Sequence, residues 1–220
     1  MATVMSSQLK IVQLYFATTA GRDKFYRAIQ YFCRFLVQHS TGINQDKLKS
    51  IVSNASVTRK WLRLVRLDFF NPLVEEIEKP SKLKRTDPVL HYLTVIRNIS
   101  MQLFFYCDHA ILFQSLKLYN PTKDTLQNIK TFQMRFWAAG LILSIFKQIH
   151  STNSYPRKQL DGEQSFAAKM KETKTLLMDI FDLMIPLTSL GYTHFSESAV
   201  GIFGTITALN GVNEVLRKTM

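Results

Sequence analysis

Apolar side chains recur every three or four residues along most of the 220-residue chain, which is the spacing of one face of an α-helix. The pattern predicts helices over about 7–19, 22–38, 46–78, 88–118, 122–149, 164–188 and 197–217. Gly21 is expected to end the first of them in the left-handed conformation. No stretch alternates apolar and polar residues between hairpin turns, as strands do. The sequence therefore predicts an all-α fold, a bundle of six to seven helices.

The segment 46–78 divides into two faces of different chemistry when it is drawn as a helix. One face is apolar and carries Val57, Thr58, Trp61, Leu62, Val65 and Phe69. The other is basic and carries Lys49, Arg59, Lys60, Arg63 and Arg66. A wide apolar face opposite clustered Lys and Arg is typical of a helix that lies in a membrane interface. We expect this helix to bend or break near Asn71 and Pro72.

The energies of the two faces favour binding to an anionic membrane. A large apolar side chain that leaves water contributes roughly 1.5–3 kcal/mol. A Lys or Arg near an anionic surface contributes about 1 kcal/mol. We therefore predict that the apolar face inserts through Trp61, Leu62, Val65 and Phe69. We predict that the basic face selects anionic lipid through Lys49, Arg59, Lys60, Arg63 and Arg66. A second interpretation stays open, in which the helix docks on the protein's own core and its charges are solvated.

The second helix has a regular apolar stripe of its own. Phe25, Ile29, Phe32 and Leu36 repeat along it, and Arg27, Tyr31 and Arg34 occupy another side. In the last helix, Gly201, Gly204 and Gly211 give a smooth side that would let another helix approach closely. Chance placement of these glycines is an equal alternative.

Two polar segments, 78–88 and 150–163, separate the helices, and Asp87 before Pro88 favours a helix start. No run of eighteen apolar residues marks a clear membrane span. The nearest stretches, 136–146 and 199–209, are short and typical of buried helices. We therefore expect a membrane-associated bundle without an obvious span, although a span with sheltered polar residues stays open.

The formal net charge of +12 changes the picture because much of it is concentrated in one segment. Residues 22–66 carry ten Lys or Arg against Asp23 and Asp46, a local charge of +8. Such a field predicts an anionic partner, namely lipid head groups, nucleic acid or an acidic protein. No nucleic-acid-binding module is recognisable, and phosphate binding does not need a broad apolar face, so lipid is the favoured partner. The two cysteines indicate a reducing compartment rather than a disulfide framework.

The sequence shows no catalytic signature of the nucleotide-binding, hydrolase or metalloprotease kinds. The five histidines are scattered, and Asp179 and Asp182 are more typical of a solvated helix stripe than of a metal pair. We therefore predict a protein that is not an enzyme and that has no catalytic residues, cofactor or metal.

Residues 20–36 resemble the opening motif of the peroxin-eleven family, the peroxisomal membrane proliferation proteins. The matching residues are Gly21, Arg22, Asp23, Lys24, Gln30, Tyr31, Arg34, Phe35 and Leu36. A second block matches at Arg59, Lys60, Leu62 and Arg63, and a third at Leu190, Gly191 and Tyr192 before a glycine-containing helix. The blocks keep the family's order along nearly the full length, which implies one peroxin-eleven-like domain over 1–220. We expect Gly21 to Lys24 to set a bend between two helices rather than to bind a ligand.

The resemblance implies a location in the peroxisomal membrane, or the glycosomal membrane in some protists. Members self-associate, elongate the organelle before fission, and cooperate with a fission adaptor and a dynamin-related GTPase. Their basic amphipathic helix, which aligns with residues 46–70, inserts into the cytosolic leaflet and curves it. The family also implies that the protein is not an enzyme and needs no cofactor.

Two alternative functions stay open from the residues themselves. Segment 88–118 is nearly all apolar but contains Arg97, Asp108 and His109, and such groups line polar paths in channels for small metabolites. The high net charge would also fit a soluble basic helical module that binds nucleic acid, although we expect no nucleic acid.

Overall fold

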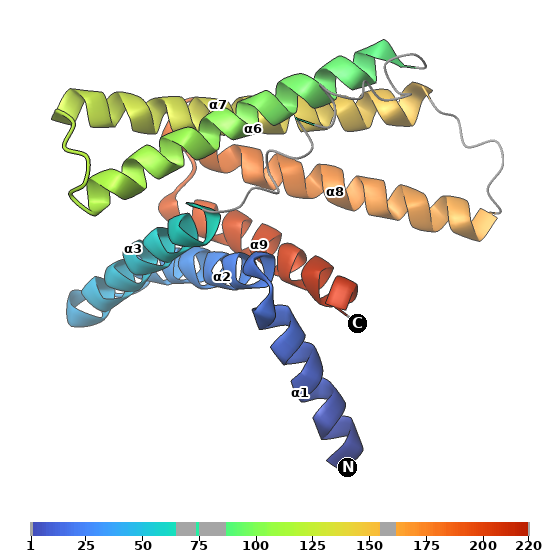
Figure 1. Ribbon diagram of the computed structural model, residues 1–220, viewed down its shortest axis with the longest axis horizontal. Helices are drawn as coiled ribbons and strands as arrows, with labels where there is room; N and C mark the ends of the chain where they lie inside the picture. Colours follow the sequence, from blue (N-terminus) through green and yellow to red (C-terminus); the bar gives the residue numbers. More distant parts are fainter. Residues whose placement is uncertain (1, 65–73, 75–86, 155–161, 220) are drawn as a thin grey trace. The chain divides into compact units, whose positions relative to one another are not determined.

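A computed structural model describes residues 2–64, 74, 87–154 and 162–219. In this part of the chain there are seven helices and no strands, which confirms the all-α prediction. The helices are α1 (Ala2–Ala17), α2 (Thr19–Val37), α3 (Gly42–Leu64), α6 (Pro88–Ser115), α7 (Lys123–Ser154), α8 (Gly162–Ser189) and α9 (Glu197–Thr219) (Figure 1).

The chain divides into two compact units that we describe separately. The first consists of Met1–Val65 together with His194–Met220, and the second of Arg66–Thr193. The first unit therefore joins the beginning and the end of the chain, and the second is made of the segment between them. A single domain over 1–220 stays a prediction.

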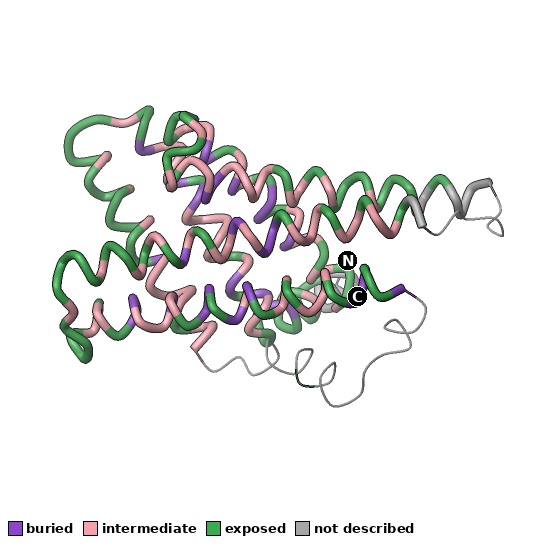
Figure 2. The backbone as a smooth tube through the Cα atoms, turned by 90° about the horizontal axis from the view of Figure 1, so that it is seen from above, coloured by how far each residue is buried: buried purple, intermediate pink, exposed green. Residues whose placement is uncertain are grey.

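Helix α2 is the centre of the first unit. It packs along α9 and along α3, and α1 contacts both α2 and α9. Buried positions alternate with exposed ones along the helices (Figure 2), as expected where each helix turns one face to its neighbours. The predicted basic helix 46–78 corresponds to α3, which the structure describes up to Leu64. The predicted break near Asn71 and Pro72 lies outside the described residues.

Helices α2 and α9 approach closely because glycines line their contact. A β-carbon at Gly201 would lie 2.6 Å from the backbone nitrogen of Phe35, and one at Gly204 would overlap the ring of Tyr31. A β-carbon at Gly211 would lie 2.8 Å from Cδ of Lys24. The smooth side of the last helix therefore makes a tight helix–helix contact inside the chain.

The junction between α1 and α2 differs from the prediction. The side-chain oxygen of Thr18 caps α2 by accepting a hydrogen bond of 3.0 Å from the backbone N–H of Gly21. Gly21 thus lies in the first turn of α2, and the predicted left-handed cap is wrong. Among the described glycines only Gly42 and Gly191 have positive φ, of 58° and 79°. Gly21 is needed for space instead, because a β-carbon there would overlap the carbonyl group of Tyr15.

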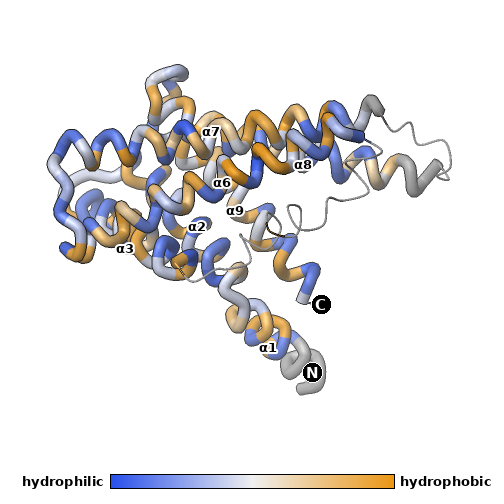
Figure 3. Tube along the Cα trace, turned by 45° about the horizontal axis from the view of Figure 1, so that its top comes forward, coloured by the Kyte–Doolittle hydropathy of each residue, from blue (hydrophilic) through white to orange (hydrophobic). Residues whose placement is uncertain are grey.

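In the second unit α7 packs against both α6 and α8, and all three carry apolar stretches (Figure 3). Asp87 caps α6 by accepting a hydrogen bond of 2.9 Å from the N–H of Leu90, and Pro88 stands in the first turn, which confirms the predicted helix start. Helix α7 continues through Ser154, so the first residues of the predicted polar segment 150–163 are helical. Residues 78–86 of the other polar segment lie outside the described residues.

Several polar side chains inside the second unit form hydrogen bonds between neighbouring helices. The amide of Gln133 on α7 donates a hydrogen bond of 2.8 Å to Asp108 on α6, which is almost fully buried. Ser144 and Gln148 on α7 donate to Asp179 on α8. Burial raises the pKa of the Asp179 carboxyl above its usual value, although these two hydrogen bonds partly oppose the effect. These groups bridge helices in the way that buried polar side chains commonly do.

Within the described residues, α9 is the one helix whose length and apolar composition would let it cross a membrane. One third of its most apolar stretch (33%) is buried in the protein. The same composition occurs in core helices of soluble proteins, so it does not by itself establish a span.

Candidate functional site

The basic side of α3 is turned toward α2, where Arg59 makes an internal ion pair. Its Nε lies 3.1 Å from Oδ1 of Asp23, and its Nη1 donates a hydrogen bond of 2.7 Å to Oε1 of Gln30. The side chains of Arg59 and Asp23 are only 12% and 10% exposed. Asp23 and Gln30 are seven residues apart, so two turns of α2 place them on the same side of the helix. One arginine of α3 is therefore held by two residues of the family-like motif.

The charges around Asp23 keep this pair ionised. Burial by itself would raise the pKa of the Asp23 carboxyl. The positive charges of Arg59, Arg63 and Lys24, together with the hydrogen bond from Arg59, outweigh burial and hold that pKa below its usual value. The pair therefore stays charged at neutral pH and fixes α3 on α2.

The other predicted lipid-binding residues have different environments. Lys49 is exposed and lies 3.8 Å from Asp46. Lys60 and Arg63 are partly buried, and Nε of Arg63 donates a hydrogen bond of 3.1 Å to the carbonyl oxygen of Arg59. Arg66 lies outside the described residues. The structure thus places Arg59 inside the protein and leaves Lys49 at the surface, and a role in lipid binding stays a prediction for all five.

The predicted inserting residues can be located only in part. Trp61 is 48% exposed. It follows Arg59 by two positions, which is about 200° around a helix, so it lies on the side of α3 away from α2. Leu62 is partly buried, and Val65 and Phe69 lie outside the described residues. Insertion of these four residues stays a prediction, and the exposed indole of Trp61 is compatible with it.

The remaining motif residues of α2 hold α9. Arg34 makes an ion pair with Glu197, with 2.6 Å between Nε and Oε2. Tyr31 is buried and faces Gly204, and Lys24 lies beside Gly211. Arg22, in contrast, is exposed. The motif Gly21, Arg22, Asp23, Lys24, Gln30, Tyr31 and Arg34 is therefore mainly a structural element that joins α1, α3 and α9 to α2.

Sequence reasoning did not identify Thr207 and Glu197, two residues of α9 that hold this unit together. Arg27 donates a hydrogen bond of 3.1 Å to the hydroxyl of Thr207 on α9, and Glu197 accepts the ion pair from Arg34. The one sequence signal for this contact is that Arg27 and Arg34 are seven residues apart, which places both on one side of α2. Their partners are more than 150 residues away in sequence and could not be inferred from that spacing.

A pocket of about 280 Å³ opens where α2, α3 and the start of α9 meet. It is lined by residues of mixed charge and polarity, namely Gln30, Arg34, Val37, Gln38, Lys49, Val52, Ser53 and Glu197. The carboxylate of Glu197 in this lining is paired with Arg34. The lining contains no histidine or cysteine that could act as a base or nucleophile. In the part of the chain described here, no three acidic, histidine or cysteine side chains cluster as a metal site.

The chain is similar in sequence to known peroxisomal membrane proteins along most of its length. The chain is 22% identical to peroxisomal membrane protein PMP27 of Saccharomyces cerevisiae, with 91% of each chain covered. It is 23% identical to human peroxisomal membrane protein 11A, with 88% of this chain and 91% of the relative covered. Similarity extends to peroxisomal membrane protein 11-1 of rice, at 23% identity over 92% of this chain and 89% of the relative. No solved structure matches the chain.

The profile of one protein family matches residues 9–216, which include every described helix at least in part. That family consists of biogenesis factors and is not a family of enzymes. The chain belongs to the peroxisomal biogenesis factor 11 (PEX11) family.

Proposed function

We propose that this chain is a peroxisomal membrane protein that curves and elongates the membrane and so promotes peroxisome proliferation and fission. Relatives covered over about nine tenths of their length are named peroxisomal membrane proteins. The observation that carries the mechanism is the orientation of α3, which turns Arg59 inward and leaves Trp61 on its outer side. A helix held in this way presents Trp61 without first leaving the protein.

The proposed mechanism is shallow insertion of the C-terminal part of α3, together with the residues that follow it in the sequence, into one leaflet. Trp61, Leu62, Val65 and Phe69 would enter between head groups, which adds area to that leaflet alone and bends the membrane. We assign direct contact with anionic head groups to Lys49, Lys60, Arg63 and Arg66, because Arg59 would first have to leave Asp23. At about 1 kcal/mol each, these four charges would favour anionic over neutral lipid by about 4 kcal/mol.

The experiment uses the full chain with vesicles of phosphatidylcholine alone or with phosphatidylserine. Trp61→Asp should strongly reduce binding and tubulation of the anionic vesicles. Ile43→Asp is the matched control, because Ile43 is an exposed apolar residue on the same helix, 75% exposed and outside the inserting segment. Circular dichroism should show equal helix content in both variants. Equal tubulation by the two variants, or equal binding to neutral and anionic vesicles, would contradict the mechanism.

We propose further that the chain self-associates and works with a fission adaptor and a dynamin-related GTPase. We also propose that it has no catalytic activity and needs no cofactor. Peroxisomal or glycosomal location should be determined with a fluorescent fusion, together with organelle number after gene deletion. A diffuse cytosolic signal would contradict the membrane location. Neither the described residues nor the relatives give an observation that favours a pore or a nucleic-acid-binding module.

A further inference from the structure

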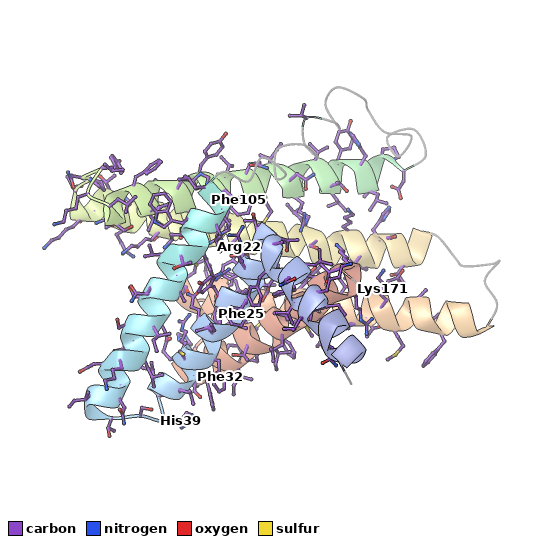
Figure 4. The ribbon with its side chains drawn as sticks, turned by 60° about the horizontal axis from the view of Figure 1, so that its bottom comes forward. Arg22, Phe25, Phe32, His39, Phe105 and Lys171 are labelled. Atoms are coloured by element: carbon purple, nitrogen blue, oxygen red, sulfur yellow. The ribbon has the colours of Figure 1, made fainter. Side chains whose placement is uncertain are left out.

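The outer side of α2 carries an apolar stripe that the first unit does not cover. Phe25, Ile29, Phe32 and Leu36 lie at successive turns of the helix. The side chains of Phe25 and Phe32 are 40% and 50% exposed. Figure 4 shows Phe25 and Phe32 following Arg22 along α2. The spacing of these residues is typical of a helix face that packs on a protein core, but Phe25 and Phe32 are exposed to solvent.

The reason for the exposure is that α2 uses its polar sides for packing. Asp23 and Gln30 hold α3, and Arg27 and Arg34 hold α9. The helix therefore turns Asp23, Arg27 and Arg34 toward protein, together with the buried ring of Tyr31, and leaves Phe25 and Phe32 on its outer side. An exposed apolar surface of this kind marks an interaction site.

The stripe continues onto α1. The ring of Phe16 meets the ring of Phe25 edge to face, with 5.1 Å between centroids. Leu9, Val12 and Phe16 share one side of α1, where Leu9 and Val12 are also exposed. Two helices of different direction thus contribute to one apolar surface, which we call the α1–α2 stripe and define as Leu9, Val12, Phe16, Phe25, Ile29, Phe32 and Leu36.

We propose that the α1–α2 stripe lies against lipid at the membrane–water boundary and is a second lipid-contacting surface besides α3. Exposed Arg22 lies three residues before Phe25 on α2, beside the stripe, and would contact head groups. The charge of +8 over residues 22–66 complements an anionic bilayer. The same charge would oppose a second copy of the chain seated on the stripe, since it would bring like charges together. The proposal rests on the membrane location proposed above and not on curvature by α3.

The test measures lipid contact at single positions of the full chain. In a Cys33→Ala, Cys107→Ala background, Phe32→Cys carries an environment-sensitive fluorophore. The control label is at Gln38→Cys, an exposed position just after the end of α2 that lines the pocket described above. Vesicles of phosphatidylcholine and phosphatidylserine are prepared with and without a nitroxide on the lipid acyl chain.

The label at position 32 should brighten on vesicle binding and be quenched several-fold more by the nitroxide lipid than the label at position 38. Equal weak quenching at both positions would overturn the proposal. Efficient cross-linking between labels at position 32 in two copies, without lipid quenching, would also overturn it and assign the stripe to a second copy.

The outcomes separate this inference from the proposed function. A chain that fails to bind vesicles at all would refute the membrane location and the stripe together. Binding without quenching at position 32 would refute only the stripe. Strong quenching at position 32 in Trp61→Asp, which should no longer tubulate, would support the stripe independently of the α3 mechanism.

Discussion

Removing the carboxylate of Asp23 should release α3 from α2. In Asp23→Ala the guanidinium of Arg59 would stay largely buried with only Gln30 as a partner. Breaking a buried ion pair in this way costs about 3–5 kcal/mol. Because the two side chains retain 12% and 10% exposure, we expect the lower end, about 3 kcal/mol. At 1.4 kcal/mol for each factor of ten, the equilibrium for local opening of α3 should rise by roughly 100-fold.

Hydrogen exchange of the α3 amides measures this opening, and the amides of α6 and α7 in the second unit serve as the internal reference. Asp23→Asn is the matched control, because it keeps a hydrogen-bond acceptor beside Arg59 and removes only the charge. Asp23→Leu combined with Arg59→Met should be much less destabilised than Asp23→Ala, since no unpaired charge is left. Exchange in α3 that rises less than a few-fold in Asp23→Ala would refute the assignment of Asp23 and Arg59 as the contact that holds α3.

Three further predictions concern the same unit. Because the pKa of Asp23 is lowered in the folded protein, its stabilising effect should be complete above the unfolded pKa of about 4 and be lost as the pH falls through the lower folded pKa; a pH titration of α3 exchange checks this. Gly204→Ala should cost about 1–3 kcal/mol despite the better helix propensity of alanine, because its β-carbon would overlap Tyr31; thermal melting against Ile202→Ala, on the exposed side of α9, measures it, and equal melting temperatures would contradict the tight contact. Arg34→Ala should cost less than about 1 kcal/mol, because the pair with Glu197 is partly solvated, and a larger loss in the same melting assay would show that Arg34 has a further structural role.

The helices could be predicted from the sequence because their signals are local. Apolar periodicity, the pair Asp87 and Pro88, and the turn at Gly191 all act within a few residues, and the structure has helices in those places. The predicted left-handed conformation of Gly21 is wrong because glycine can be required either for a positive φ or for close packing. Only the carbonyl group of Tyr15, which lies against Gly21, shows that close packing is the reason here. A sequence pattern cannot distinguish these two uses.

The faces of the helices were harder to predict than the helices themselves. Amphipathicity shows that Arg59 and Trp61 lie on different sides of α3, but it does not show which side meets protein. The structure buries Arg59, since Asp23 lies opposite it, and leaves Lys49 of the same basic face exposed. The same inversion affects α2, where Phe25 and Phe32 look like core residues by spacing and are exposed. Such pairings depend on contacts between segments far apart in sequence.

The glycine-lined contact between α2 and α9 ties the start of the chain to its end, and this constrains the order in which the protein can mature during synthesis. Thr19–Val37 leaves the ribosome early, but its partner Glu197–Thr219 is made after all the other described helices. Until α9 has been made, Arg27 and Arg34 of α2 lack Thr207 and Glu197, and Tyr31 lacks the contact with Gly204. Helices α6, α7 and α8 pack within the second unit, so this unit could fold during synthesis before the first unit does.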